Sequence, residues 1–240
     1  MGTLKLKVDR ALIIRGKDVP LSVEYAEGCA KSCEEHGLPY EFIDAVYMAP
    51  GQAAYDSVGA KIKHNWGFNN GNAGCHASMI KCWDRIIELD KTCLILEHDA
   101  LVCGDTTTID IPDDAVVTFG FRIGTGQTYK PISKIKTLTR IQKSVGAHAY
   151  AITPKTAKWL IHDARVVGLT CGVDRWLMMG PRSGLPLYVA DPPQAVCWVR
   201  KSSMGHKEQK NTGRSFGVTS PHNNAECANL PSWKQGLSHK

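Results

Sequence analysis

The chain has 240 residues, of which 43% are hydrophobic and 22% are charged, and its formal net charge is +6. These values are ordinary for a globular protein and exclude wholesale disorder and a collagen-like repeat. No apolar run approaches the ~20 residues that a membrane-spanning helix needs. Residues 1–10 carry charges but no apolar stretch before a cleavage site, so no signal peptide is predicted. We therefore expect a cytoplasmic protein without a membrane span.

The length predicts one domain followed by a C-terminal extension. Residues 1–198 have the composition of a folded domain, whereas residues 199–240 are basic and rich in Ser, Gly, Lys and Asn, which predicts an irregular extension. The nine cysteines contain no C-x-x-C pair, so neither a zinc ribbon nor a thioredoxin-like motif is predicted. Buried thiols in a reducing compartment are expected instead.

The first part of the chain alternates between strand and helix patterns. Residues 11–15 (A-L-I-I-R) predict a buried strand, and residues 22–36 predict a helix with Ser22 as its cap and Gly37 as its stop. Residues 40–46 predict a second strand. This β-α-β order indicates a parallel sheet with helices packed against it.

The middle of the chain continues this α/β pattern. Residues 51–74 are rich in Gly, Asn and Ala and predict a loop. Residues 75–89 predict an amphipathic helix, because their apolar residues recur on one helical face. Residues 92–96 (T-C-L-I-L) predict a fully buried strand.

The second half of the chain predicts four further elements. Strands are expected at residues 116–121 and at residues 147–153, and His148 within the latter is expected to be a core residue. A helix is expected from Pro154 to about residue 164, with the proline in its first turn, and a short helix at residues 171–179.

Two carboxylates follow the apolar strand, in L-I-L-E-H-D-A at residues 94–100. Glu97 and Asp99 lie two positions apart, so an extended backbone would place both on one face. The carboxyl end of a strand in an open α/β sheet borders the ligand crevice. Two carboxylates there can hold Mg²⁺ or Mn²⁺, which bridges the phosphates of a nucleotide.

Four short motifs around this strand resemble those of glycosyltransferase family 25. They are F-I-D-A-V at 42–46, G-N-A-G-C-H-A-S-M at 71–79 before Trp83, G-A-H-A-Y-A-I-T at 146–153 and G-V-D at 172–174. Their order and spacing match the family from about residue 12 to about residue 194. The chain differs from the family at Asn72 (usually Glu), Met79 (His) and His98 (Asp), and it has Arg15 and Lys17 in place of an arginine pair.

The resemblance implies a GT-A fold, which is a Rossmann-like three-layer α/β/α arrangement with a mostly parallel central sheet. It also implies an inverting transferase that uses a nucleotide sugar, most simply a UDP-sugar, together with Mn²⁺ or Mg²⁺. The implied metal ligands are Asp99, Glu97 and, as a third, His206. Asp174 is the candidate general base, and the alternative reading is that it caps a helix.

The resemblance also assigns the donor-binding residues. They are Ile14, Arg15, Asp44, Ala45, Val46, Asn72, Gly74, Ser78, Glu97 and His98. A related protein that binds a nucleotide sugar or a nucleic acid without catalysing transfer is the alternative to an active enzyme.

The charge distribution suggests a polyanionic acceptor. Residues 115–162 contain eight Lys or Arg and no Asp or Glu, and a second basic cluster spans residues 200–214. We expect DNA bearing hydroxymethylated pyrimidines, contacted through its phosphates, with lipopolysaccharide as the rival acceptor and a merely solvated face as the alternative. The expected acceptor-binding residues are Lys134, Lys136, Arg140 and Arg175. Either acceptor suits a bacterial or viral enzyme acting inside a cell.

Overall fold

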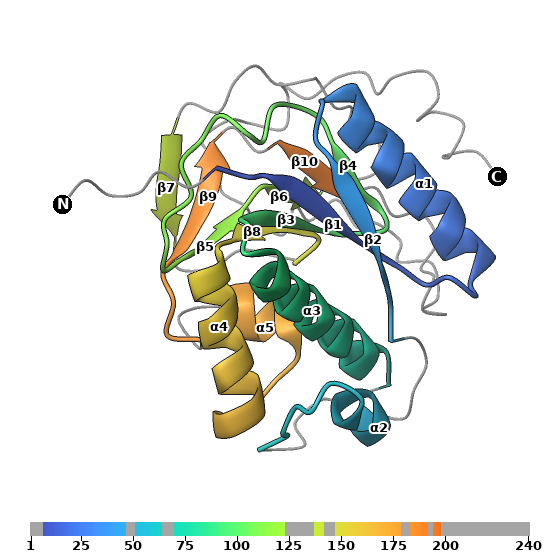
Figure 1. Cartoon of the computed structure of the whole chain (residues 1–240), viewed down its shortest axis with the longest axis vertical. Helices are drawn as coiled ribbons and strands as arrows, with labels where there is room; N and C mark the ends of the chain where they lie inside the picture. The colour runs from blue at the N-terminus through green and yellow to red at the C-terminus, as the bar shows by residue number, and fades with distance from the viewer. Residues whose placement is uncertain are drawn as a thin grey trace.

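A mixed central sheet forms the middle of the molecule (Figure 1). The computed structural model describes residues 7–46, 51–63, 70–122, 137–141, 147–178, 183–191 and 194–197. The strands of the sheet are β1 (Arg10–Arg15), β2 (Tyr40–Asp44), β3 (Cys93–Glu97), β5 (Val116–Thr118), β7 (Thr137–Ile141), β8 (Ala149–Ile152) and β9 (Leu187–Asp191). Their order is β2-β1-β3-β8-β5-β9-β7, and only β7 and β8 run against the other five. The predicted mostly parallel α/β sheet is confirmed.

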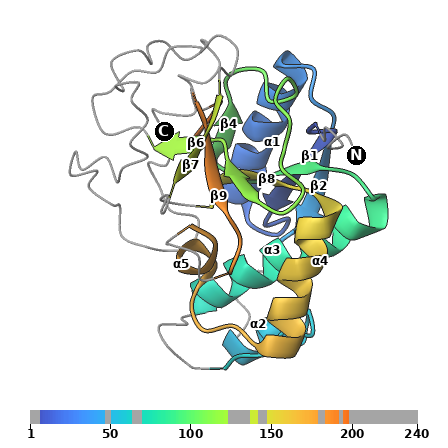
Figure 2. The same ribbon diagram turned by 90° about the vertical axis from the view of Figure 1, so that its left-hand side faces the viewer.

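Helices cover both faces of this sheet (Figures 1 and 2). They are α1 (Pro20–Glu35), α2 (Gly51–Asp56), α3 (Asn70–Leu89), α4 (Pro154–His162), a π-helix η1 (Asp163–Val167) and α5 (Val173–Met178). A second sheet has the order β4-β10-β6, with β4 (Ala100–Val102), β6 (Gly120–Arg122) and β10 (Ala195–Cys197). One core lies between the central sheet and α3, α4 and α5, and the other lies under α1 and the second sheet. The expected three-layer arrangement is therefore present.

The strand β3 shows why the site-bearing segment folds as it does. Its residues Cys93 to Leu96 are completely buried. Ile95 belongs to the core under α3, whereas Leu94 and Leu96 belong to the core under α1. A strand covered on both faces needs a continuous apolar run, not an alternating one. The run stops at Glu97, which is only half-buried, and this fixes where the carboxylates emerge.

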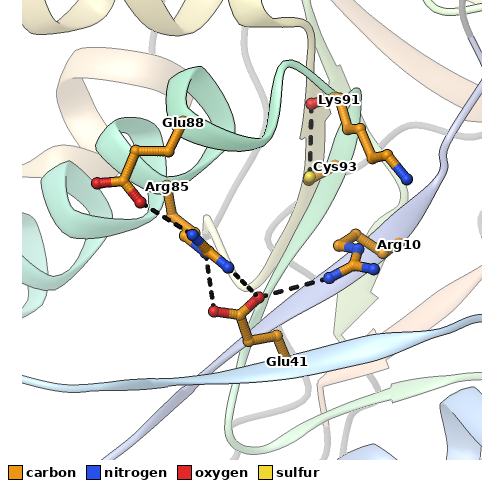
Figure 3. Close-up of polar contacts among 6 residues, drawn as sticks. All are labelled: Arg10, Glu41, Arg85, Glu88, Lys91 and Cys93. Atoms are coloured by element: carbon orange, nitrogen blue, oxygen red, sulfur yellow. Dashed lines mark hydrogen bonds and ion pairs between the residues drawn. The ribbon is translucent and has the colours of Figure 1, made fainter.

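An ion-pair network ties α3 to the first two strands (Figure 3). Arg85 of α3 donates from Nε and Nη2 to the two carboxylate oxygens of Glu41 in β2, at 2.8 and 3.1 Å. Glu41 also pairs with Arg10 of β1 at 3.5 Å, and Arg85 pairs with Glu88 at 3.0 Å. The two-point geometry of an arginine–carboxylate pair fixes orientation as well as distance. The network therefore sets how α3 lies on the sheet.

The predicted cap of the first helix is wrong. The helix begins at Pro20, with Val19 at the N-cap, and Ser22 lies within its first turn. Ser22 is buried, and its Oγ accepts a hydrogen bond of 2.9 Å from the backbone N–H of Gly16. Proline suits the first helical position because that position needs no N–H donor. Ser22 thus holds the loop between β1 and α1.

Residues 51–74 are not a loop throughout, as the sequence had predicted. They contain α2, and α3 begins at Asn70, five residues earlier than expected. The burial of Ala54 and Tyr55 explains α2, since both side chains are fully enclosed by the core. Tertiary burial here outweighs the poor helix propensity of Gly and Asn.

The expected strand at 116–121 is divided between two sheets. Phe119 separates β5 from β6, and its N–H donates to the carbonyl of Ala149 in β8 at 3.0 Å. Its own carbonyl accepts from the N–H groups of Gln194 and Ala195, each at 2.9 Å, at the start of β10. The chain therefore crosses from the central sheet to the second sheet at this residue.

A histidine of α3 lies in a buried aromatic cluster. His76 is fully buried, and its ring centroid lies 5.8 Å from that of Tyr55, 6.0 Å from Trp83 and 5.7 Å from Trp176. Neither ring nitrogen has a hydrogen-bond partner among the residues that the structure describes. Burial lowers the pKa of His76 from 6.5 to about 3, because a charge in this cluster would lose its hydration.

This histidine is expected to weaken the fold in mild acid. Between the two pKa values the unfolded chain binds a proton that folded His76 does not. The free energy of unfolding should therefore fall by about 1.4 kcal/mol per pH unit below about pH 6.5, until His76 itself is protonated near pH 3. Urea unfolding of wild type and His76→Phe at about pH 7.5 and about pH 5 measures this. Between these two pH values the free energy of unfolding of wild type should fall by roughly 2 kcal/mol more than that of the variant. Equal falls would show that His76 does not cause the acid sensitivity.

Candidate functional site

The carboxyl ends of β1 and β2 carry a charged cluster. Arg15, the last residue of β1, donates from Nη2 to Oδ1 of Asp44 at 3.2 Å, and Lys17 Nζ lies 3.6 Å from Oδ2 of the same carboxylate. The Arg15 guanidinium also lies over the Phe42 ring, 4.4 Å from its centroid. The backbone N–H of Ala45 donates to the Arg15 carbonyl at 2.8 Å, which holds the end of β2 beside β1.

The first half of α3 closes this cluster from the side. Ser78 Oγ accepts from the backbone N–H of Val46 at 2.9 Å and donates to the carbonyl of Gly74 at 2.6 Å. The Lys81 ammonium donates to the backbone carbonyl of Asp44. These bonds join the expected donor residues Arg15, Asp44, Ala45, Val46, Gly74 and Ser78 into one continuous region.

The side chain of Ile14 has a different place from the other expected donor residues. It is 7% exposed and belongs to the core under α3. Any donor contact at this position would therefore involve the backbone. Asn72 lies at the start of α3 on the other side of the region, with its Cβ 3.9 Å from where a Cβ on Gly172 would stand. Asn72 thus borders the turn that leads into α5.

The thiol of Cys75 lies against one carboxylate and within electrostatic range of two others. The thiol donates to Oε1 of Glu97, with 3.7 Å between sulfur and oxygen. Burial raises the pKa of Cys75 well above its usual value, and the negative charges of Glu97, Asp174 and Asp99 raise it further. These acids come from β3, from the turn after it and from α5. The structure joins Glu97 to Cys75 by a hydrogen bond, and the charges of Asp99 and Asp174 act on the same thiol.

Asp99 reaches this position by a turn, not by an extended strand as expected. β3 ends at Glu97, and His98 and Asp99 form the turn before β4. The His98 ring stacks on Tyr25 of α1, with centroids 5.9 Å apart and planes 20° apart. Burial raises the pKa of Tyr25, and the charges of Glu24 and Asp99 add to the effect. Asp99 therefore follows the end of β3 in the turn that leads into β4.

Asp174 is exposed and lies in the first turn of α5. Its Oδ1 accepts a hydrogen bond of 2.8 Å from the backbone N–H of Ala147, just before β8. A helix cap accepts from the first amides of its own helix, whereas this oxygen binds an amide of another segment. The bond fixes the carboxylate beside the end of the sheet that carries Glu97.

The donor set fits a divalent cation whose coordination is completed by phosphates. Magnesium is commonly held by one or two carboxylates together with substrate phosphates, and Glu97 and Asp99 provide such a pair. No group of three or more His, Cys, Asp or Glu suited to a metal occurs among the residues that the structure describes. The expected third ligand, His206, lies outside them. The described residues thus include two of the expected ligands, Glu97 and Asp99.

The expected acceptor residues are only partly brought to this region. Arg175 is exposed next to Asp174 in α5. Arg140 is exposed on β7, with β8, β5 and β9 between it and β3, so roughly 19 Å of sheet separates the two strands. Lys134 and Lys136 lie outside the described residues. Of the described cations, Arg175 thus lies beside Asp174, whereas Arg140 lies four strands away from β3.

Several residues of this region were given no role by the sequence reading. Cys75 lies within one of the motifs, but the motif does not predict its bond to Glu97. The spacing of a helix would place Lys81 on the same face as Ser78, three residues earlier. Tyr25 and Ala147 carried no local signal. Their contacts join segments far apart in the sequence.

Part of the chain that includes this region matches a known protein family. Residues 26–115 match the family described as glycosyltransferase family 25 (LPS biosynthesis protein). The chain carries a family-25 glycosyltransferase segment. This segment includes α3 and β3 with Cys75, Ser78, Glu97 and Asp99. The match confirms the resemblance for the motifs within it, at 42–46 and 71–79, and the protein is a glycosyltransferase. Asp174 lies beyond the matched family-25 segment.

Other comparisons are weaker. No curated protein matches the chain by sequence. One similar solved structure is described as a glycosyltransferase involved in the glycosylation of the major capsid of PBCV-1. It is 12% identical, covers 81% of this chain and 95% of its own, and has a TM-score of 0.41, which supports no conclusion about site or substrate. In the part of the glycosyltransferase that the structure describes, no helix is long and apolar enough to cross a bilayer.

Proposed function

We propose that this glycosyltransferase is a metal-dependent, inverting enzyme that moves a sugar from a nucleotide sugar, most simply a UDP-sugar, to a hydroxyl group. The observation that supports this best is the hydrogen bond between Cys75 and Glu97, with the charges of Asp99 and Asp174 acting on the same thiol. The bond lies at the carboxyl end of β3, where open α/β sheets bind their ligands. Two of these acids lie in the segment that matches family 25.

The charged cluster beside the carboxylates suits the nucleotide. Arg15 and Lys17 pair with the Asp44 carboxylate, and Lys81 adds a third cationic group at the backbone carbonyl of Asp44. Such an excess of positive charge favours a phosphorylated ligand. The Phe42 ring under the Arg15 guanidinium keeps that group in one orientation. We assign this cluster to the donor.

The carboxylates divide into two roles. Glu97 and Asp99 would hold the cation, which when bound neutralises charge developing on the leaving diphosphate. Asp174 would accept the proton of the acceptor hydroxyl as its oxygen attacks the anomeric carbon from the side opposite the leaving group. The Ala147 amide binds Oδ1 of Asp174 and so leaves Oδ2 for the acceptor. The new bond forms as the bond to the diphosphate breaks, which inverts the anomeric carbon.

A saccharide is the acceptor that we propose first, because the family description names lipopolysaccharide biosynthesis. Hydroxymethylated DNA remains a prediction that the described residues do not favour. Lys155 of the basic stretch pairs with Asp113 at 3.5 Å, so this part of the stretch is neutralised in space. Arg140 of the same stretch lies on the far edge strand.

The test is nucleotide release from a panel of nucleotide sugars. The full chain is incubated with each donor and Mn²⁺, with and without a lipooligosaccharide core or hydroxymethylated duplex DNA, and free nucleotide and acceptor mass are measured. We expect release that requires the cation and a mass gain of one hexose on the saccharide. A mass gain on DNA alone would show that DNA, and not a saccharide, is the acceptor. If the protein binds donors but releases no nucleotide from any of them, the proposed transfer activity is wrong and the protein is a binding protein.

A further inference from the structure

Two neighbouring residues connect both sides of the site. The backbone carbonyl of His148 accepts from the N–H of Glu97 at 2.9 Å, which continues the pairing of β3 with β8 by one step. The N–H of Ala147 donates to Oδ1 of Asp174 at 2.8 Å. The segment 147–148 therefore binds the residue proposed to hold the cation and the residue proposed to take the proton.

The imidazole of His148 is packed against a glycine of the other sheet. His148 is fully buried. A Cβ built on Gly120, the first residue of β6, would stand 2.2 Å from Nε2, 2.7 Å from Cδ2 and 2.9 Å from Cε1 of this ring. Real Cβ contacts are never so short, so the ring occupies the space that any other residue at 120 would need.

The surface behind the ring is itself firmly held. Gly120 pairs with Ala195 of β10, and the preceding Phe119 bonds to both sheets through its N–H and its carbonyl. A ring placed against such a wall has little freedom to move, because close-packed interiors transmit displacement instead of absorbing it. The position of residue 120 therefore determines the position of the backbone at 148.

We propose that His148 is a positioning residue, whose ring against Gly120 fixes segment 147–148 and thereby the separation between Glu97 and the Asp174 carboxylate. The proposal rests on the function proposed above, since that separation matters only if the two acids act on one substrate pair. A displacement of about 1 Å between reacting groups costs on the order of 10²-fold in rate. Segment 147–148 contacts the backbone of Glu97 but not the basic donor cluster of Arg15, Lys17 and Lys81 in the bonds described, so the main electrostatic contacts to the donor should be kept.

The first test separates turnover from donor binding. In His148→Ala we expect kcat for transfer to fall by at least about 10-fold per folded molecule, with the donor KM within about twofold of wild type. Ile86→Ala is the matched control, because Ile86 is fully buried in α3 about 16 Å along the helix from Cys75. It should lower Tm while keeping kcat. An unchanged kcat in folded His148→Ala would overturn the proposal.

A double substitution tests the contact itself. Gly120→Ala should lower Tm and kcat together, because the new methyl group meets the ring. Adding His148→Ala removes the ring, so the double variant should regain Tm relative to Gly120→Ala while its kcat stays low. Equal and additive losses in Tm would show that the two positions do not interact and would overturn the proposal.

A readout independent of catalysis keeps the two proposals apart. The Ala147 amide should exchange with deuterium faster in His148→Ala than in wild type, and Asp174→Ala, which removes the acceptor, gives the reference for an unbonded amide. Wild-type protein that transfers no sugar would defeat the proposed function, yet the exchange experiment would still test the positioning. If the Ala147 amide is equally protected in folded His148→Ala and in wild type, the proposed positioning role of His148 is wrong.

Discussion

Asp99→Asn is expected to abolish transfer at every concentration of Mn²⁺ while leaving the protein folded. The substitution keeps the shape of the side chain but removes the charge that would hold the cation at the end of β3. Loss of a metal from a transferase site removes several kcal/mol of transition-state stabilisation, which corresponds to a fall in rate of roughly 10³-fold. Transfer measured over a Mn²⁺ titration, together with Tm, tests this.

The matched control for Asp99 lies at the opposite end of the same strand. Asp90 is exposed before β3 with a φ of 50°, a conformation that asparagine adopts readily. Asp90→Asn should therefore keep both Tm and turnover. Near wild-type turnover of Asp99→Asn at saturating Mn²⁺ would remove Asp99 from the metal site.

Asp174→Asn is expected to keep donor binding and to lose transfer by roughly 10²-fold or more, as for a missing general base. The amide oxygen of the asparagine can still accept from the N–H of Ala147, so the position of α5 should be preserved. This makes the variant a test of proton transfer and not of folding. Donor affinity is measured by calorimetry, and kcat is measured at saturating donor and acceptor.

Asp174→Ala provides the comparison. It removes the base and the hydrogen bond to Ala147 together, so it should lower Tm as well as kcat. If Asp174→Asn turned over like wild type while Asp174→Ala lost stability, the residue would have a structural role only, and another group would have to accept the proton.

The fold class and the place of Glu97 at the end of β3 could be predicted from the sequence because their signals are local. The apolar runs of β1 and β3 and the periodic apolar face of α3 report burial within single elements, and the structure has all three. The motifs around Cys75 and Glu97 lie within the segment that matches family 25. Since Glu97 directly ends a buried run, its place at the end of the sheet followed from the sequence as well.

Four strands escaped the sequence reading because their pairing depends on distant partners. β4, β7, β9 and β10 had no predicted counterpart, and β4 and β10 are only three residues long. A segment of three residues is too short to show a period. β10 exists because Ala195 to Cys197 pair with β4 on one side and β6 on the other. Such pairing is formed between segments and has no local signature.

The sequence by itself determined that this protein is an α/β glycosyltransferase with Glu97 and Asp99 at the end of a buried strand. Only the tertiary structure decided that Asp99 reaches the site through a turn, that Arg140 lies on the far edge strand, and that the ring of His148 rests on Gly120. The reason is physical: periodicity and apolar runs are properties of one segment, whereas the distance between two side chains depends on how separate segments pack and pair in the folded chain.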